Sequence, residues 1–262
     1  MRYKLWAVEK LTKRPSSVFL YGLWDGKHSV EPVSTILVGW PQRAVLPLRA
    51  SDIIWHFVAN QELSGKTCGQ HPLHVLQIGS GSAILPGLMT HALGSRHVLV
   101  DLPEQAAVGF SVLSEIFPNL RVLLPNELVM GETNIEDADI VFITPEQLDW
   151  LEQKEFEVAV NMFSFQEMSH DTISEYFELI RTHLKPGGIF YCMNRALKRN
   201  YDDYSTSEFA NYPWSPVDEF LYDFTFDGVL ADVKVAGKSV RESVVRLASR
   251  VESTWEWGRV PQ

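Results

Sequence analysis

The chain has 262 residues and a formal net charge of −10. This acidic balance, without any basic tract, argues against a nucleic-acid-binding surface, because phosphate binding needs clustered Lys and Arg. The two cysteines, Cys68 and Cys192, are too few for a disulfide scaffold or a cysteine-based zinc site. No apolar leader begins the sequence and no apolar run reaches the roughly 18 residues that cross a bilayer, so we expect a soluble, cytoplasmic protein without a membrane partner.

The pattern of the chain changes near residue 71. Over residues 1–70 prolines interrupt short apolar runs, which predicts an N-terminal arm or cap, and residues 71–262 form the main domain. In the main domain strand-like and helix-like segments alternate, which is typical of a parallel sheet with helices on both faces. The predicted strands are 73–78, 97–101, 139–144, 156–163, 189–193, 219–226 and 243–249. Residues 121–124 are an alternative to 139–144 as the third strand, or they pair at an edge of the sheet.

Helices are predicted over about 83–93, 103–117 and 172–184. In the third, Thr172 and Glu175 fit a capping box, and one face is apolar at helical spacing. Five strand–helix units followed by two strands indicate an α/β, Rossmann-like fold. Its central, mostly parallel sheet has seven strands with helices on both faces, and it ends in a C-terminal antiparallel hairpin.

The sequence QIGSGSA (77–83) joins the first strand to its helix. Gly79 and Gly81 allow a tight turn and a close approach of the backbone to a ligand. The helix N-terminus beyond them offers free N–H groups. Asp101 ends the second strand, where a carboxylate can accept both ribose hydroxyls of an adenosine-containing cofactor. This order of elements therefore predicts a nucleoside-containing cofactor.

The kind of nucleoside follows by elimination. Ile84 stands where the dinucleotide fingerprint needs a third small residue, so a pyrophosphate fits poorly. No tyrosine has a lysine four residues on, as short-chain reductases require, and neither Gly-Lys-Ser/Thr string has the earlier glycine of a phosphate loop. The sequence also lacks a G-x-S-x-G elbow and zinc-ligand spacing. S-adenosyl-L-methionine, which carries no phosphate, remains.

Four strings in order resemble the sugar O-methyltransferases of bacterial glycan and antibiotic biosynthesis, which are class I S-adenosylmethionine-dependent enzymes. They are LQIGSGSA (76–83), VLVDLPEQ (98–105), NMFSFQEM (161–168) and LKPGGIFYCMNR (184–195), within a likeness that covers about 36–250. The resemblance implies the class I fold and methyl transfer to a sugar hydroxyl. The position before the turn is usually acidic in this group, and here Gln77 can still accept a hydrogen bond from the methionine ammonium. The cofactor-binding residues expected are Gln77, Gly79, Ser80, Gly81, Asp101, Leu102 and Asn161.

A sugar hydroxyl is a poor nucleophile, so a general base contributes about 10²–10⁴ in rate. Glu167 and His170 follow the fourth strand and are the candidates, either as the base or with Glu167 orienting His170. They also fit a solvated loop acid and a residue near a helix cap. Asn194 and Arg195, after the fifth strand, are expected to hold acceptor hydroxyls, and Trp214 to stack on a sugar ring.

The adjacent acids Asp202 and Asp203 read as a solvated turn, so no metal is expected. Two further functions stay open at this stage: methylation of another small metabolite, and a noncatalytic adenosyl-binding protein. The sugar-like acceptor is the expected partner, and a homodimer is left open.

Overall fold

The computed structural model describes residues 72–130, 137–199, 206–227, 234–235, 238–239 and 242–250. The predicted arm over 1–70 and the Asp202–Asp203 pair lie outside these ranges. Within them, no helix has the length and apolar character needed to cross a membrane.

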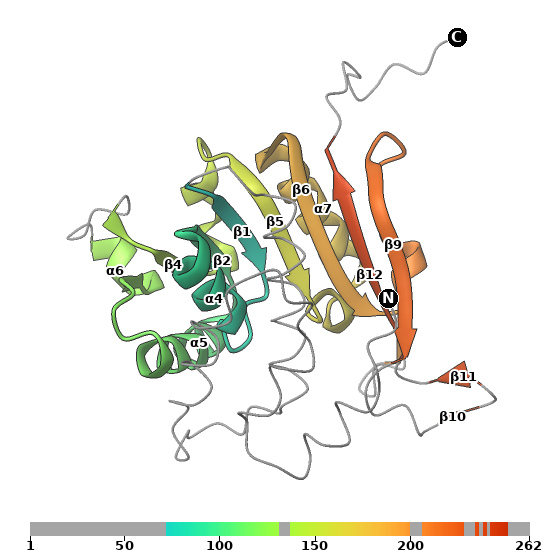
Figure 1. Ribbon diagram of the computed structural model, residues 1–262, viewed down its shortest axis with the longest axis horizontal. Helices are drawn as coiled ribbons and strands as arrows, with labels where there is room; N and C mark the ends of the chain where they lie inside the picture. The colour runs from blue at the N-terminus through green and yellow to red at the C-terminus, as the bar shows by residue number, and fades with distance from the viewer. Residues whose placement is uncertain are drawn as a thin grey trace, which may run out of the picture.

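An eight-stranded sheet forms the centre of the domain (Figure 1). Its strand order is β3-β4-β2-β1-β5-β6-β12-β9. The first six of these strands are mutually parallel, and β12 is antiparallel to both of its neighbours. The bounds are β1 (His74–Ile78), β2 (Arg96–Val100), β3 (Val122–Leu123), β4 (Ile140–Ile143), β5 (Phe156–Met162), β6 (Leu184–Arg195), β9 (Glu219–Asp227) and β12 (Glu242–Ser249).

The predicted α/β sheet is confirmed, with a mostly parallel centre and a C-terminal antiparallel pair. Each of the seven expected segments forms a strand, and the eighth strand is β3, which lies within 121–124. It pairs with β4 at the edge of the sheet through Val122 and Leu123 only. A pairing of two residues leaves little apolar pattern in the sequence, which is why the count differs by one.

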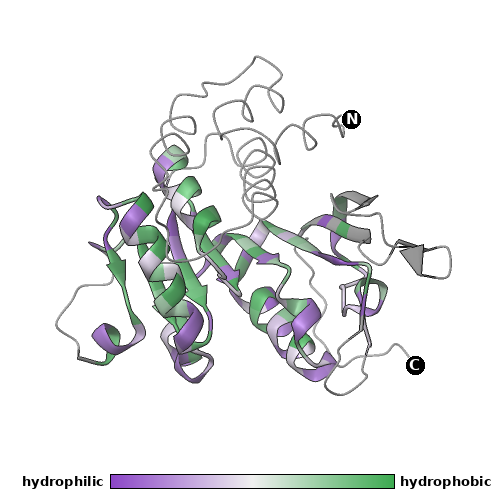
Figure 2. Ribbon diagram, turned by 90° about the horizontal axis from the view of Figure 1, so that it is seen from below, coloured by the Kyte–Doolittle hydropathy of each residue, from purple (hydrophilic) through white to green (hydrophobic). Residues whose placement is uncertain are grey.

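Helices cover both faces of the sheet. On one face α4 (Ile84–Leu93) and α5 (Pro103–Ile116) pack against β1, β2, β4 and β5 (Figure 1). On the other face α7 (His170–His183) buries Ile173, Phe177 and Ile180. Hydrophilic residues lie along the outer sides of the helices (Figure 2). The shorter helical elements are α6 (Pro125–Met130), η4 (Pro145–Leu151), η5 (Phe165–Glu167) and η6 (Phe209–Asn211).

Two small antiparallel pairings complete the described chain. The strand β7 (Leu197–Arg199) pairs with β8 (Thr206–Glu208), and β10 (Lys234–Val235) pairs with β11 (Lys238–Ser239). The β7–β8 pair follows β6 directly and therefore extends the chain beyond the carboxyl end of that strand.

The start of α7 differs from the sequence prediction. Ser169 is the N-cap, and its Oγ accepts a hydrogen bond from the Thr172 N–H at 3.1 Å. The expected Thr172–Glu175 capping box is therefore wrong, because the same chemistry acts three residues earlier. As a consequence, His170 is the first residue of the helix rather than a residue that precedes it.

Candidate functional site

The parallel strands bring most of the predicted site residues to one edge of the sheet. The carboxyl ends of β1, β2, β5 and β6 meet there, and β1 lies between β2 and β5. The chain leaves β1 toward β2 on one side, and it leaves β5 toward β6 on the other. Such a divergence of connections is where open α/β sheets bind ligands.

The glycine turn after β1 has a backbone that other residues adopt with difficulty. Gly79 has φ +73°, in the left-handed region. A Cβ at this position would lie 2.2 Å from the Ser164 Oγ, so there is no room for a side chain. Gly81 has φ +52°, but among the described residues no atom beyond its two chain neighbours lies within 4 Å of the Cβ position. Glycine at 79 is thus required by both conformation and space, and glycine at 81 by conformation alone.

Asp101 holds this turn in place. Its Oδ2 accepts hydrogen bonds from the Ser80 N–H at 2.6 Å, the Ser80 hydroxyl at 2.7 Å and the Gly81 N–H at 3.2 Å. Its Oδ1 accepts one from the Leu102 N–H at 2.9 Å. The carboxylate thus bonds to four donors of the protein, in the place where the sequence predicts bonds to ribose. The Leu102 side chain beside it is 56% exposed.

Gln77 leaves an acceptor without a partner directly below the turn. Its side chain is buried, and Nε2 donates to the Gly79 carbonyl at 3.1 Å. Among the residues that the structure describes, nothing donates to its Oε1, which is itself buried. An unpaired buried acceptor costs about 1–3 kcal/mol, so a donor from a bound molecule at this point would be stabilising.

Asn161 and Asn194 connect three strands through buried amides. The Asn161 Nδ2 donates to the Ile78 carbonyl at the end of β1, at 2.9 Å, and also to the Ser164 hydroxyl. Its Oδ1 accepts from the Asn194 Nδ2 at 2.8 Å. The Asn161 side chain is therefore engaged within the protein, and it joins the ends of β1, β5 and β6.

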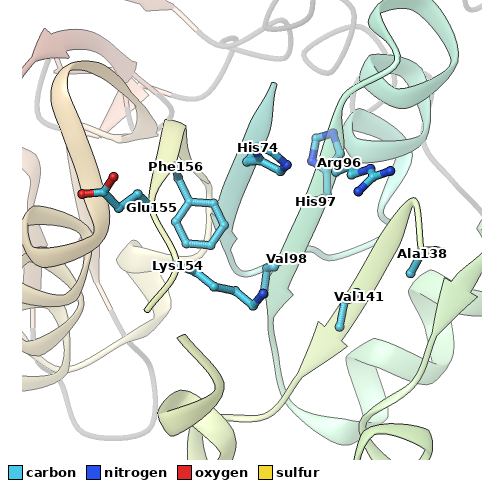
Figure 3. A pocket seen from close by; sticks show the side chains of 9 residues that line it. All are labelled: His74, Arg96, His97, Val98, Ala138, Val141, Lys154, Glu155 and Phe156. Carbon is cyan, nitrogen blue, oxygen red and sulfur yellow. The ribbon is translucent and has the colours of Figure 1, made fainter. Parts of the chain in front are cut away.

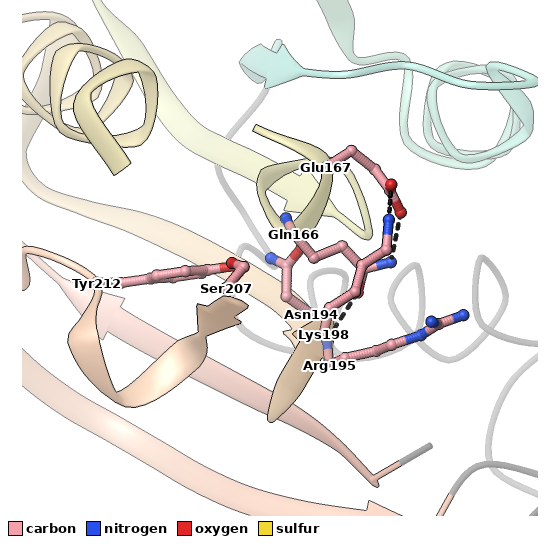
Figure 4. Close-up of polar contacts among 7 residues, drawn as sticks. All are labelled: Gln166, Glu167, Asn194, Arg195, Lys198, Ser207 and Tyr212. Atoms are coloured by element: carbon pink, nitrogen blue, oxygen red, sulfur yellow. Dashed lines mark hydrogen bonds and ion pairs between the residues drawn. The ribbon is translucent and has the colours of Figure 1, made fainter. Parts of the chain in front are cut away.

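Gln166 extends this network to the charged residues Glu167 and Lys198 (Figure 4). Its N–H donates to the Asn194 Oδ1 at 3.3 Å, and its Oε1 accepts from the Arg195 N–H at 2.9 Å. Its Nε2 donates to the Glu167 Oε1 at 3.1 Å, and Glu167 forms an ion pair with Lys198. Burial lowers the pKa of the Lys198 ammonium. Sequence reasoning missed Gln166 and Lys198, although Gln166 lies within the string NMFSFQEM.

The side chains of His170 and Arg195 are less constrained. The His170 Nε2 lies 3.2 Å from the Asn211 carbonyl, and the residue is exposed. No hydrogen bond joins His170 to Glu167 in the described part of the chain, so the structure does not show Glu167 orienting it. The Arg195 guanidinium points away from the Gln166–Glu167 cluster (Figure 4). It forms no hydrogen bond or ion pair with any described residue.

Phe163, directly after β5, is a bulky residue with a left-handed backbone that the sequence did not indicate. It has φ +57°, which a bulky side chain rarely adopts and which costs of order 1–3 kcal/mol. Its N–H donates to the Met193 carbonyl at 2.7 Å, and this bond fixes the unusual conformation. The turn that results brings Ser164 against Gly79.

Trp214 belongs to an aromatic cluster on the α7 side of the sheet. Its ring centroid lies 5.0 Å from that of Phe177 and 5.3 Å from that of Phe190, and the Arg246 guanidinium lies 4.9 Å above it. These contacts occupy ring surface that the sequence assigned to a sugar. Across the described residues, no group of three or more His, Cys, Asp or Glu side chains is arranged to hold a metal ion.

The comparisons with known proteins concern the fold. No family model and no curated protein matches the chain. Among solved structures, it is similar to a "putative sarcosine dimethylglycine methyltransferase" from Galdieria sulphuraria, with a TM-score of 0.54 and 11% identity over 76% of this chain and 86% of that one. TehB from Haemophilus influenzae gives a TM-score of 0.46 and 14% identity over 72% of this chain and 62% of that one. The first of these shows that the chain has the class I methyltransferase fold.

Proposed function

We propose that this protein transfers a methyl group from S-adenosyl-L-methionine to a hydroxyl of a sugar or a sugar-bearing small molecule. The observation that carries the proposal is the glycine turn between β1 and α4, in a class I methyltransferase fold. The turn offers Gly79 without space for a side chain and, below it, the unpaired Oε1 of Gln77. The choice of a sugar rests on the sequence resemblance alone.

The residues around the turn fit the cofactor. The unpaired Gln77 Oε1 can accept a hydrogen bond from the methionine ammonium, and the exposed Leu102 side chain can pack against the adenine ring. The Asp101 Oδ1 accepts a hydrogen bond only from the Leu102 N–H among the described residues, so it has a position left for one ribose hydroxyl, and Oδ2 can accept the other once the Ser80 hydroxyl or the Gly81 N–H turns away from it.

The chemistry that the cofactor supplies when bound is a methyl carbon activated by the sulfonium, so the protein has to orient the acceptor hydroxyl and take its proton. Glu167 and His170 follow β5 at the carboxyl edge and are the proposed bases. Asn194 and Arg195, at the carboxyl end of β6, are proposed to hold the acceptor, and the Arg195 guanidinium has no partner among the described residues. In this proposal the end of β6 binds the acceptor and Glu167 or His170 takes its proton, and no step uses a metal.

Binding of S-adenosylhomocysteine, measured by calorimetry, is the first test. Binding in the micromolar range supports the proposal, and no binding near millimolar concentration overturns it. Methyl transfer to a panel of nucleotide sugars, glycosides and unrelated hydroxylated metabolites then identifies the acceptor. Transfer confined to the unrelated metabolites would replace the sugar with that class and leave the cofactor residues unchanged.

The base is tested with Glu167→Gln and His170→Gln. We expect one of them to lower turnover by about 10²–10⁴ while the affinity for S-adenosylhomocysteine stays the same. Glu178→Gln, an exposed acid on α7, is the matched control and should keep normal turnover. If both test variants turn over normally, neither residue is the base.

A further inference from the structure

The outer end of the amide network brings two further side chains to the Glu167 carboxylate (Figure 4). Gln166 is buried, and its Nε2 donates to the Glu167 Oε1 at 3.1 Å. The Lys198 ammonium forms an ion pair with the Glu167 Oε2, and the Lys198 side chain is 14% exposed, against 54% for Glu167. Each carboxylate oxygen therefore has a partner, one from η5 and one from β7, while the side chain still reaches solvent.

The short helix η5 starts from the residue that lies against the glycine turn. That residue is Ser164, whose Oγ would lie 2.2 Å from a Cβ at Gly79. The Glu167 N–H donates to the Ser164 carbonyl at 3.0 Å, which closes one turn of 3₁₀ helix. Three residues at a rise of about 2.0 Å each span roughly 6 Å, so the Glu167 backbone lies one helical turn from the contact with Gly79.

The anchored carboxylate keeps positions for an acceptor hydroxyl. A carboxylate accepts about four hydrogen bonds, two at each oxygen. Gln166 and Lys198 are the donors that the described part of the chain supplies to the Glu167 side chain, and they take one position on each oxygen. A side chain that is held from two sides and is more than half exposed is suited to orient a hydroxyl and to take its proton.

His170 is less suited to the same task. Its Nε2 lies 3.2 Å from the Asn211 carbonyl. Because a carbonyl oxygen only accepts, this nitrogen carries the proton of the neutral ring and cannot take another from an acceptor. The remaining nitrogen, Nδ1, lies on the backbone side of the ring, at the first residue of α7. These contacts favour Glu167 over His170 as the proton acceptor.

We propose that Glu167 takes the proton of the acceptor hydroxyl, and that Gln166 and Lys198 are positioning residues that hold its carboxylate in place. These roles rest on the proposed methyl transfer. As the acceptor oxygen forms its bond to the methyl carbon, its proton passes to Glu167, and the carbon–sulfur bond breaks with its electron pair left on sulfur. The protonated carboxyl group, more than half exposed, then gives the proton to water.

Turnover is measured by methyl transfer from S-adenosyl-L-methionine to the compound of the acceptor panel that the wild type methylates fastest. Glu167→Gln should lower kcat by about 10²–10⁴, and His170→Gln at least about tenfold less. Lys198→Met should lower kcat by about 10- to 100-fold with the KM for S-adenosyl-L-methionine unchanged, because the base is misplaced while the cofactor contacts stay. Lys198→Arg keeps a cation for the carboxylate and should restore kcat to within about threefold of the wild type. A larger loss in His170→Gln, or wild-type kcat in Lys198→Met, overturns the proposal.

The control variant comes from the amino edge of the sheet, where the proposed transfer uses no residue. There His74 borders a cavity of about 200 Å³ (Figure 3), and Glu157, which accepts from the His74 N–H, forms an ion pair with Lys185. Lys185→Met removes the lysine of such a pair, as Lys198→Met does, and should leave kcat unchanged; an equal loss would overturn the proposal. Gln166→Met should lower kcat like Lys198→Met, and where circular dichroism shows that it does not fold, the two Lys198 variants decide.

The ion pair is tested without cofactor or acceptor in a double-mutant cycle. Urea midpoints are compared for Glu167→Gln, Lys198→Met and the double variant. Glu167→Gln leaves a largely buried ammonium without this partner, so adding Lys198→Met should lower the midpoint less than it does in the wild type. Equal shifts in both backgrounds would show that the two side chains do not interact, which overturns the proposal. A wild type that binds no S-adenosylhomocysteine would instead overturn the proposed function, and with it the catalytic role of the pair, whatever the cycle shows.

Discussion

Asp101 should stabilise the protein even when no cofactor is bound. Its carboxylate accepts three hydrogen bonds from Ser80 and Gly81 and one from Leu102. In Asp101→Asn only one of the two side-chain oxygens remains. The hydrogen bonds to that oxygen become bonds to a neutral group, and the hydrogen bonds to the other position, which is now an NH₂ group, are lost. Bonds to charged groups contribute about 1.5–3 kcal/mol and neutral ones about 0.5–1.5 kcal/mol. Because the four bonds share one group and do not add, we expect a loss of about 2 kcal/mol in the free energy of unfolding.

Urea denaturation measures this loss. With a slope near 3 kcal/mol per molar for a chain of this length, 2 kcal/mol lowers the urea midpoint by about 0.7 M. Asp149→Asn, which removes an exposed acid in η4, is the control and should change the midpoint little. The affinity for S-adenosylhomocysteine, measured without urea, should fall by a further 1–3 kcal/mol, about 5- to 150-fold. An unchanged midpoint in Asp101→Asn would refute the argument that this carboxylate holds the turn.

Three further changes give separate readouts. Gly79→Ala should destabilise by at least about 3 kcal/mol in urea, from left-handed strain plus the contact with Ser164, whereas Gly81→Ala should cost only about 1 kcal/mol; equal effects would contradict the space argument. Burial lowers the pKa of His97 to about 3, so the unfolded chain binds a proton that the folded chain does not between that value and about 6.5. Stability should therefore fall as the pH drops from 6.5 toward 3, by up to about 1.4 kcal/mol per pH unit, and His97→Gln should flatten this slope in urea midpoints taken between pH 4.5 and 7.5. Trp214→Ala should lower the free energy of unfolding by about 3 kcal/mol through lost packing, whereas an unchanged stability with impaired acceptor use would support the predicted stacking of Trp214 on the acceptor and contradict the packing role.

The fold was predictable where the pattern extends over many residues. The parallel strands at the centre of the sheet are buried on both faces. Accordingly β4 reads as a continuous apolar run, and β1 and β5 are mostly apolar, interrupted by Gln77 in β1 and by Glu157 and Asn161 in β5. The long amphipathic face of α7 was equally clear. The two-residue β3 was expected only as one of two alternatives, an edge pairing of 121–124, which the structure confirms, and the six-residue α6 was not predicted, because such short elements carry little pattern of their own.

Local capping chemistry was the weakest part of the sequence prediction. Ser169 and Thr172 both precede apolar residues at helical spacing, and each is a suitable N-cap. The sequence analysis considered only Thr172, and the structure instead has Ser169 as the N-cap, with its Oγ accepting from the Thr172 N–H. The choice matters for the site, because it makes His170 the first helical residue and sets the ring against the Asn211 carbonyl.

The residues of the candidate site were also predictable only in part. The glycine turn and Asp101 were found because strand, turn and acid follow one another in a fixed order. The network of Asn161, Asn194 and Gln166 was not, since its members are 28 and 33 residues apart and meet only when β5 and β6 pair. Phe163 had no signal at all, because a left-handed backbone at a bulky residue is imposed by tertiary contacts such as its bond to Met193.

The carboxyl edge therefore uses neutral amides inside and charges outside. Each buried amide has a fixed direction: Asn161 donates to the Ile78 carbonyl and accepts from Asn194, and Asn194 in turn accepts from Gln166. A carboxylate in place of the Asn161 amide would set two oxygen atoms against each other at Ile78, at a cost that burial increases. Charge first enters this chain of hydrogen bonds at Glu167, which is 54% exposed and carries its own counter-ion in Lys198. A proton acceptor placed at that outer end can gain or lose charge without disturbing the buried bonds that hold β1, β5 and β6 together.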